Sequence, residues 1–137
     1  MDGLAIYFSL LGHNKEIAEG IANQKDYEIH EFAPGSKLRV FQFFFGKKKL
    51  RKNARDLNSK IEKYSNLAIC GPIWGGKPAP AVKILLEELN LENKNVEFHI
   101  TYTQNYGEVE NSIRDLMSEK SANLKEINFT SISEKKC

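Results

Sequence analysis

The chain has 137 residues, of which 41% are hydrophobic, and its 20 Lys and Arg against 18 Asp and Glu give a formal net charge of +2. This length and composition predict one globular domain, residues 1–137, and exclude a second domain. We expect a cytoplasmic protein without membrane insertion, because the sequence shows no secretion leader, no apolar run near the roughly 20 residues that cross a bilayer, and only Cys70 and Cys137 as cysteines.

The first part of the chain predicts two strands and a helix. Residues 4–9 form a nearly continuous apolar run, as expected for a central parallel strand that is covered on both faces. A helix is expected from about Asn14, because apolar residues recur at helical spacing between residues 17 and 22. Residues 26–32 alternate between polar and apolar and predict an edge strand.

Residues 36–57 combine an aromatic stripe with a run of positive charge. Residues 40–45 carry apolar side chains at helical spacing, and a basic stretch follows at once. It contains Lys47, Lys48, Lys49, Arg51, Lys52 and Arg55. One interpretation is a crossover helix packed on the sheet, with a solvated basic connector. The other is a docking patch for an acidic protein partner, assisted by electrostatic steering. Nothing else in the sequence supports nucleic acid or an anionic membrane surface as the partner.

The second half alternates strands with helices. Strands are predicted at residues 66–71, 96–102 and 123–129, which are rich in apolar residues. Helices are predicted at residues 82–89 and 109–117, where apolar residues recur every three or four positions. This alternation implies βαβ units with right-handed crossovers and a parallel sheet.

Two loops with glycines, residues 9–14 and 71–78, each follow a strand and lead into a helix. The first offers backbone N–H groups at a helix N-terminus, where a phosphate is favoured by unpaired donors and the helix dipole. The second sets Trp74 beside Gly75 and Gly76, where a flat ring can approach the backbone. A lone Trp is often a core or rim residue, but its place on this loop favours a stacking role. Together the loops suggest a mononucleotide with a large planar ring, such as a flavin.

These segments resemble the flavodoxin family. Residues 4–22 look like its first strand, phosphate loop and first helix, and residues 67–82 resemble its third strand and second flavin loop. The resemblance implies a three-layer α-β-α fold with a five-stranded parallel sheet in the order 2-1-3-4-5. It also implies that the protein binds FMN noncovalently and passes electrons between redox partner proteins. Such sheets bind ligands where the strand order reverses, here between the first and third strands.

The resemblance places the FMN contacts in three loops, the third of which follows the strand at residues 96–102. The expected residues are Ser9, Leu11, Gly12, His13, Asn14, Pro72, Ile73, Trp74, Gly75, Gly76, Thr103, Gln104, Tyr106 and Gly107. Tyr106 is the candidate for a second ring stack. We expect no catalytic residues and no metal ligands, because the three histidines lie far apart without ligand spacing.

The phosphate loop departs from the family pattern. Flavodoxins usually have Ser or Thr at three positions here, whereas this chain keeps a hydroxyl only at Ser9, with Leu11 and Asn14 at the other two. The backbone N–H groups and the amide of Asn14 remain as donors. The alternative interpretation is an ordinary strand-to-helix turn that is capped by Asn14.

Other phosphate-binding motifs do not fit. Residues 71–77 satisfy Gly-x-x-x-x-Gly-Lys, but Pro78 stands where an NTPase needs a Ser or Thr for magnesium. A receiver domain would need clustered carboxylates after the first strand, and a dinucleotide site would need Gly-x-Gly-x-x-Gly. The sequence has neither.

The leading hypothesis is therefore an FMN-dependent electron carrier. The alternatives are an NAD(P)H-dependent quinone or flavin reductase of the same fold, and an interaction module that binds no cofactor. The basic stretch departs from the acidic docking faces common in flavodoxins, so the family's partners cannot be assumed.

A final helix is not expected, because residues 131–137 are few and polar. Part of the sheet near the first and third strands would then stay uncovered, unless residues 40–45 or a second subunit in a homodimer cover it.

Overall fold

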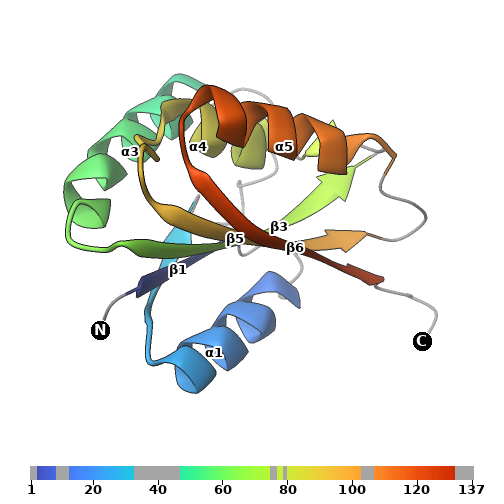
Figure 1. Cartoon of the computed structure of the whole chain (residues 1–137), viewed down its shortest axis with the longest axis horizontal. Helices are drawn as coiled ribbons and strands as arrows, with labels where there is room; N and C mark the ends of the chain where they lie inside the picture. Colours follow the sequence, from blue (N-terminus) through green and yellow to red (C-terminus); the bar gives the residue numbers. More distant parts are fainter. Residues whose placement is uncertain are drawn as a thin grey trace.

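A computed structural model of the chain describes residues 3–8, 13–32, 47–74, 77–78, 80–102 and 107–131. A twisted sheet runs through the middle of the molecule (Figure 1). Its main strands are β1 (Gly3–Phe8), β2 (Glu28–Phe32), β3 (Asn66–Trp74), β5 (Asn95–Tyr102) and β6 (Asn123–Ser131). They lie in the order β2-β1-β3-β5-β6, and every neighbouring pair is parallel. Counted along the chain, these five strands lie in the order 2-1-3-4-5. The predicted five-stranded parallel sheet is therefore confirmed.

Helices lie on both faces of this sheet. Figure 1 shows α3 (Lys47–Ile61), α4 (Pro80–Glu88) and α5 (Val109–Glu119) on one face and α1 (His13–Lys25) on the other. The three-layer α-β-α architecture is therefore confirmed as well. A two-residue strand, β4 (Lys77–Pro78), pairs antiparallel with the end of β3.

The sheet divides the core into two clusters. The larger cluster lies between the sheet and the helices α3, α4 and α5, and its fully buried side chains include Phe8, Leu85 and Phe98. The smaller cluster lies against α1. It consists of Ala5, Tyr7, Ala18, Ile21, Ala68 and Cys70. Four of these six side chains are alanine or cysteine, so α1 can pack closely across β1 and β3.

The α1 face of the sheet becomes polar toward β5 and β6. On β5, the apolar residues Val96, Phe98 and Ile100 belong to the large cluster, and the residues between them face the other way. Glu97 is joined to Lys25 at the end of α1 by a hydrogen bond. A register shift between Val96 and Glu97 brings Glu126 of β6 opposite Glu97. The part of this face beyond α1 therefore carries charged and amide side chains.

This arrangement corrects our expectation of an uncovered face near the first and third strands. Residues of β1 and β3 on this face are buried by α1, and the open part lies at β5 and β6, where the side chains are polar. Residues 40–45 and 132–137 lie outside the described residues, so their predicted roles, including the missing final helix, stay predictions.

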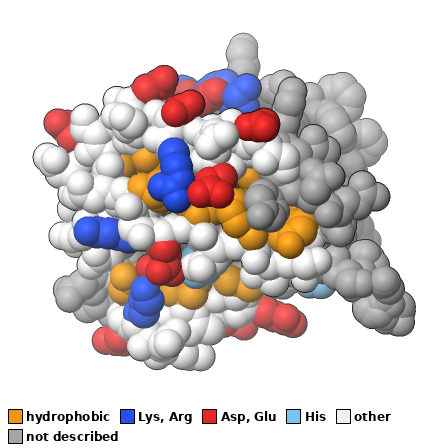
Figure 2. Space-filling view, turned by 45° about the vertical axis from the view of Figure 1, so that its right-hand side comes forward, with side chains coloured by type: hydrophobic (Ala, Val, Ile, Leu, Met, Phe, Trp, Pro, Cys, Tyr) orange, Lys and Arg blue, Asp and Glu red, His pale blue; other side chains and the backbone are white. Residues whose placement is uncertain are grey.

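Exposed apolar surface is sparse in the part of the chain that the structure describes. Ile29 is the only large hydrophobic residue exposed there. On the face seen in Figure 2, hydrophobic side chains form interrupted bands with charged side chains over and between them. The reason that we gave for a homodimer, a bare apolar face, is therefore not found in these residues. The described helices also include none with the length and hydrophobicity that crossing a membrane requires.

Candidate ligand site at the carboxyl edge of the sheet

The carboxyl ends of β1, β3 and β5 meet at one edge, because these neighbouring strands are parallel. β1 ends at Phe8 and α1 begins at His13, so the first predicted loop lies at this edge. The second, predicted as a loop over residues 71–78, consists largely of the last residues of β3 and the short strand β4, and the third follows the end of β5 at Tyr102. The fold thus brings together the starting and ending points of all three predicted flavin loops, as the arrowheads of β3 and β5 in Figure 1 show.

Asn14 joins three of these chain segments. It is the second residue of α1, yet only 1% of its surface is exposed. Its Nδ2 donates to Oγ1 of Thr101, near the end of β5, at 3.4 Å. Oγ1 of Thr101 in turn lies 3.5 Å from the carbonyl oxygen of Gly71 in β3. Both distances exceed the usual range, so the bonds are weak, but they fix the side chain of Asn14 toward the sheet.

The other end of this amide has no partner. Oδ1 of Asn14 is buried and accepts no hydrogen bond from the described residues. Leaving a buried acceptor unsatisfied costs about 1–3 kcal/mol. If the amide turns by 180°, Oδ1 accepts from the Thr101 hydroxyl and Nδ2 becomes the free group. In that orientation Asn14 presents an N–H donor at the start of α1.

The start of α1 suits an anionic ligand for a second reason. The first N–H groups of a helix lack intrahelical partners, and the helix dipole adds partial positive charge there. A helix of 13 residues has a full dipole, and its N-terminus lies at the sheet edge where the strand order reverses between β1 and β3. A free donor on a buried side chain and unpaired backbone donors therefore fit a phosphate group.

Gly71 sets how closely β3 passes its neighbours. A Cβ atom at this position would lie 2.7 Å from Cγ2 of Val82 in α4 and 3.1 Å from the ring of Phe8 in β1. Distances this short exclude a side chain without movement of these buried neighbours. The glycine therefore lets β3 pass close to both the end of β1 and the side of α4 while it stays paired with β5.

Solved structures of other proteins share this architecture. No family model and no curated protein matches the sequence. A Bacteroides uniformis protein proposed to be a flavoprotein aligns over 98% of this chain and 93% of its own, with a TM-score of 0.70 and 18% identity. A Lactobacillus acidophilus flavoprotein, solved in complex with FMN, aligns over 93% and 92%, with a TM-score of 0.63 and 18% identity. The two-electron reduced flavodoxin of Megasphaera elsdenii aligns over 98% and 90%, with a TM-score of 0.66 and 12% identity.

The chain has the flavodoxin-like fold. The match covers nearly all of each chain, so the fold extends from the first strand to the last.

Several residues predicted for the flavin site are placed within this flavodoxin-like fold. His13 is exposed, Asn14 is buried and Pro72 is partly buried in β3. Ile73 and Trp74 end β3 and pair with Pro78 and Lys77 of β4. Gly107 is exposed and has a positive φ of 52°, which a glycine adopts without strain.

The remaining predicted residues lie outside the described part of the chain. They are Ser9, Leu11, Gly12, Gly75, Gly76, Thr103, Gln104 and Tyr106. Their contacts, and the stacking roles of Trp74 and Tyr106, stay predictions.

Thr101 and Gly71 lie in segments that the sequence placed at this edge, but they were not among the residues predicted to contact the cofactor. Both are buried. A usable signal was present for Thr101, which is a hydroxyl residue near the end of a strand that leads to the predicted site.

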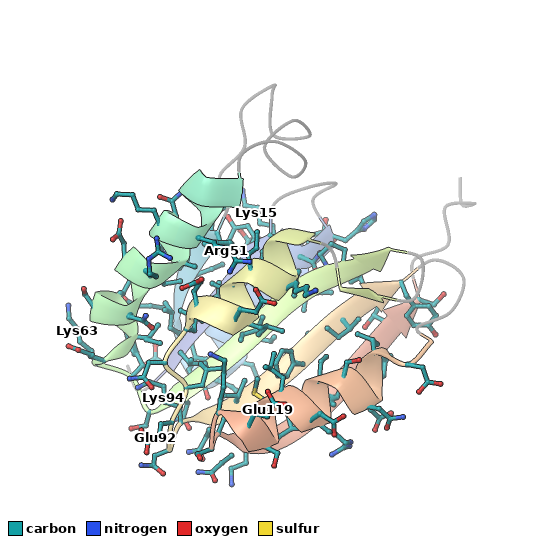
Figure 3. All side chains as sticks on the ribbon, turned by 90° about the horizontal axis from the view of Figure 1, so that it is seen from above. Lys15, Arg51, Lys63, Glu92, Lys94 and Glu119 are labelled. Atoms are coloured by element: carbon teal, nitrogen blue, oxygen red, sulfur yellow. The ribbon has the colours of Figure 1, made fainter. Side chains whose placement is uncertain are left out.

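Two arginines of the basic segment form ion pairs with the neighbouring helix α4. Arg51 extends from α3 toward α4 (Figure 3) and pairs with Glu87 at 3.0 Å and Glu88 at 2.8 Å. Arg55 also reaches Glu88, at 3.4 Å. The hydrogen bond from Arg51, reinforced by Arg55, holds the pKa of Glu88 below its usual value. Of the predicted docking residues, Arg51 therefore joins α3 to α4, and Lys52 pairs with Asp56 of its own helix.

Proposed function

We propose that this protein binds FMN noncovalently at the carboxyl edge of its sheet and carries electrons between protein partners. The observation that carries the proposal is the meeting of the α1 N-terminus with Asn14, a buried side chain with one unsatisfied polar atom, at the ends of β3 and β5. Support comes from solved structures of the same fold: a flavoprotein from Lactobacillus acidophilus and general stress protein 14 from Treponema denticola were each crystallised in complex with FMN.

Different residues bind the phosphate and the ring of FMN. Backbone N–H groups at the start of α1 and the turned amide of Asn14 hold the phosphate. Trp74, at the end of β3, and Tyr106 lie against the ring, a contact that contributes roughly 0.5–1.5 kcal/mol beyond area burial. Bound FMN supplies the redox chemistry, since its ring system accepts and releases electrons one or two at a time.

The first test is the cofactor itself. The purified chain should bind added FMN, with flavin absorption bands in the complex and quenching of the fluorescence of Trp74, the one tryptophan in the sequence. Trp74→Phe should keep most of the affinity, and Trp74→Ala should lower it by roughly fivefold, which corresponds to about 1 kcal/mol. No FMN binding at micromolar concentrations would instead favour an interaction module without cofactor.

The second test concerns electron transfer. The FMN-loaded protein, reduced with dithionite, should pass electrons rapidly to an acidic one-electron protein acceptor. It should not oxidise NADH or NADPH in the presence of a quinone or free flavin. Steady NAD(P)H oxidation under these conditions would overturn the carrier role in favour of a reductase.

We also propose that partner proteins dock near the start of α3. Arg51 and Lys52 have ion-pair partners on α3 and α4, so this role falls mainly to Lys47, Lys48 and Lys49. Replacing these three by Gln should slow electron transfer to an acidic acceptor at low salt and leave FMN affinity unchanged. An equal rate at low salt would contradict the docking role.

A further inference from the structure

A cluster of potential metal ligands lies on the open polar face of β5 and β6, away from the carboxyl edge. Glu97 and His99 occupy alternate positions of β5, and Glu126 lies opposite Glu97 on β6. One ligand atom from each of these three residues lies within 4.8 Å of the others. Glu97 is buried, His99 is partly buried and Glu126 is exposed, so the cluster opens to solvent on one side.

Glu97 is held in place by α1. Its Oε1 accepts a hydrogen bond from Nζ of Lys25 at 2.8 Å, whereas its Oε2 lies 2.6 Å from Nε2 of His99. The two oxygens therefore have separate partners. Lys25 fixes the carboxylate from one side, and the other oxygen remains directed toward His99 and the open face.

Asn128 supports the second nitrogen of His99. Its Nδ2 lies 3.4 Å from Nδ1 of His99 and donates to Glu126 at 2.7 Å. A histidine that binds a metal through Nε2 carries its proton on Nδ1 and needs an acceptor there. The Asn128 amide supplies one when it turns by 180° and Glu126 swings from Asn128 to the cation, because Oδ1 then takes the place of Nδ2 without facing the Glu126 carboxylate.

We propose that Glu97, His99 and Glu126 bind a divalent transition cation, with zinc as the best match. One imidazole nitrogen and two carboxylate oxygens form a donor set that favours zinc over magnesium or calcium, because an imidazole prefers the softer ion. The two carboxylates offset part of the charge of the cation, since Lys25 already pairs with Glu97. Three protein ligands leave a fourth position, which faces solvent and is available to water.

The geometry needs only a small adjustment. Tetrahedral zinc holds ligand atoms at about 2.1 Å, which places two of them about 3.4 Å apart. Nε2 of His99 and Oε2 of Glu97 must separate from the present 2.6 Å. The sequence analysis expected no metal ligands, because it compared spacings along the chain and could not see that the sheet places Glu126 beside Glu97.

The test is a zinc titration of the full chain in chelator-free buffer, followed by calorimetry and by NMR of the histidine ring protons. One equivalent of zinc should bind and shift the ring signals of His99, while those of His13 and His30 stay in place. Glu126→Gln, which changes an exposed side chain, should weaken binding at least tenfold, and His99→Gln should abolish it. Circular dichroism checks that both variants fold.

Two control variants and a gain of affinity sharpen the result. His13→Gln and Cys137→Ser should bind zinc as the wild type does, which excludes an exposed histidine or the terminal thiol as the ligand. Asn128→Asp should tighten binding about tenfold, because a carboxylate is a better acceptor for the Nδ1 proton. The proposal is overturned if zinc leaves the His99 signals unmoved, if Glu126→Gln binds as tightly as wild type, or if magnesium competes equally with zinc.

Discussion

Gly71 is a residue at which a single added carbon should be costly. Gly71→Ala places a methyl group against Val82 and Phe8, which are both buried. Overpacking of this kind typically costs 1–3 kcal/mol, so we expect a loss of about 2 kcal/mol in the free energy of unfolding by urea.

Val82→Ala provides the matched control for this clash. Alone it removes buried methyl groups and destabilises the protein, but in combination with Gly71→Ala it makes room for the new carbon. The double variant should therefore lose clearly less than the sum of the single losses. Additive losses would mean that the clash is not what makes glycine necessary.

His30 should make folding stability depend on pH. Burial, and then the positive charge of Lys60 on α3, lower its pKa below the ordinary value of 6.5, and Glu31 opposes them only in part. Nζ of Lys60 lies 3.4 Å from Nδ1 of His30. Asp56 of α3 and Glu31 line the same cavity, whose volume is about 380 Å³.

The sign follows from the lowered pKa. The unfolded chain takes up a proton at a higher pH than the folded protein does, so the contribution of His30 is fully present above pH 6.5 and declines as the pH falls below it. His30→Gln should flatten this decline in urea melts. Lys60→Gln should raise the pKa of His30, measured by NMR titration of its ring protons; an unchanged or lower pKa would contradict the assigned cause.

The contact between α3 and α4 depends on Arg51. This side chain bridges to Glu87 and Glu88 on the neighbouring helix, whereas Lys52 pairs with Asp56 one turn away on its own helix. Arg51→Gln should therefore lower the urea midpoint more than Lys52→Gln does, since of these two residues only Arg51 pairs with the neighbouring helix.

The difference in urea midpoint between wild type and Arg51→Gln should depend on pH, because Arg51 acts through the carboxylate of Glu88. Its pKa is held below 4.5 by the hydrogen bond from Arg51, so the stabilisation is present above pH 4.5 and is lost as the pH falls through the pKa in the folded state. The gap between wild type and Arg51→Gln should close in acid. A gap that persists unchanged at pH 2 would show that Arg51 acts through packing alone.

Strand burial was predictable where both faces of a strand are apolar. The continuous apolar run near the N-terminus predicted a central strand, and all six residues of β1 are buried. The position of the open face was not predictable in this way. It depends on α1 lying across β1 and β3, which small residues such as Ala5 and Ala68 allow, and that contact belongs to neither segment alone.

The site shows the same division between local and long-range information. The loops were found from glycines and a strand-to-helix order that are local in sequence. The hydrogen bond between Asn14 and Thr101 joins residues 87 positions apart, and no local pattern indicates it. For the same reason, the acceptor that holds Asn14 toward the sheet, Oγ1 of Thr101, became visible only in the folded chain.

At the scale of the whole molecule, two regions of different chemistry lie apart from each other. The carboxyl edge gathers the start of α1 and the ends of β3 and β5, while the open face of β5 and β6 carries Glu97, His99 and Glu126. Because the ligand atoms of the second region come from side chains that point off the sheet face, zinc binding there and FMN binding at the edge should be separable by mutation.

The account rests most heavily on a phosphate group at the start of α1. The decisive measurement is the ratio of affinities for FMN and riboflavin, which differ only in that phosphate, in Asn14→Asp and in the control Asn23→Asp on the exposed side of the same helix. A carboxylate near a helix N-terminus is compatible with folding but repels phosphate. We predict that wild type and Asn23→Asp prefer FMN, and that Asn14→Asp loses at least about tenfold in FMN affinity, or about 1.4 kcal/mol, with riboflavin affinity unchanged. Equal losses for both flavins, or no preference for FMN in the wild type, would contradict the proposed site.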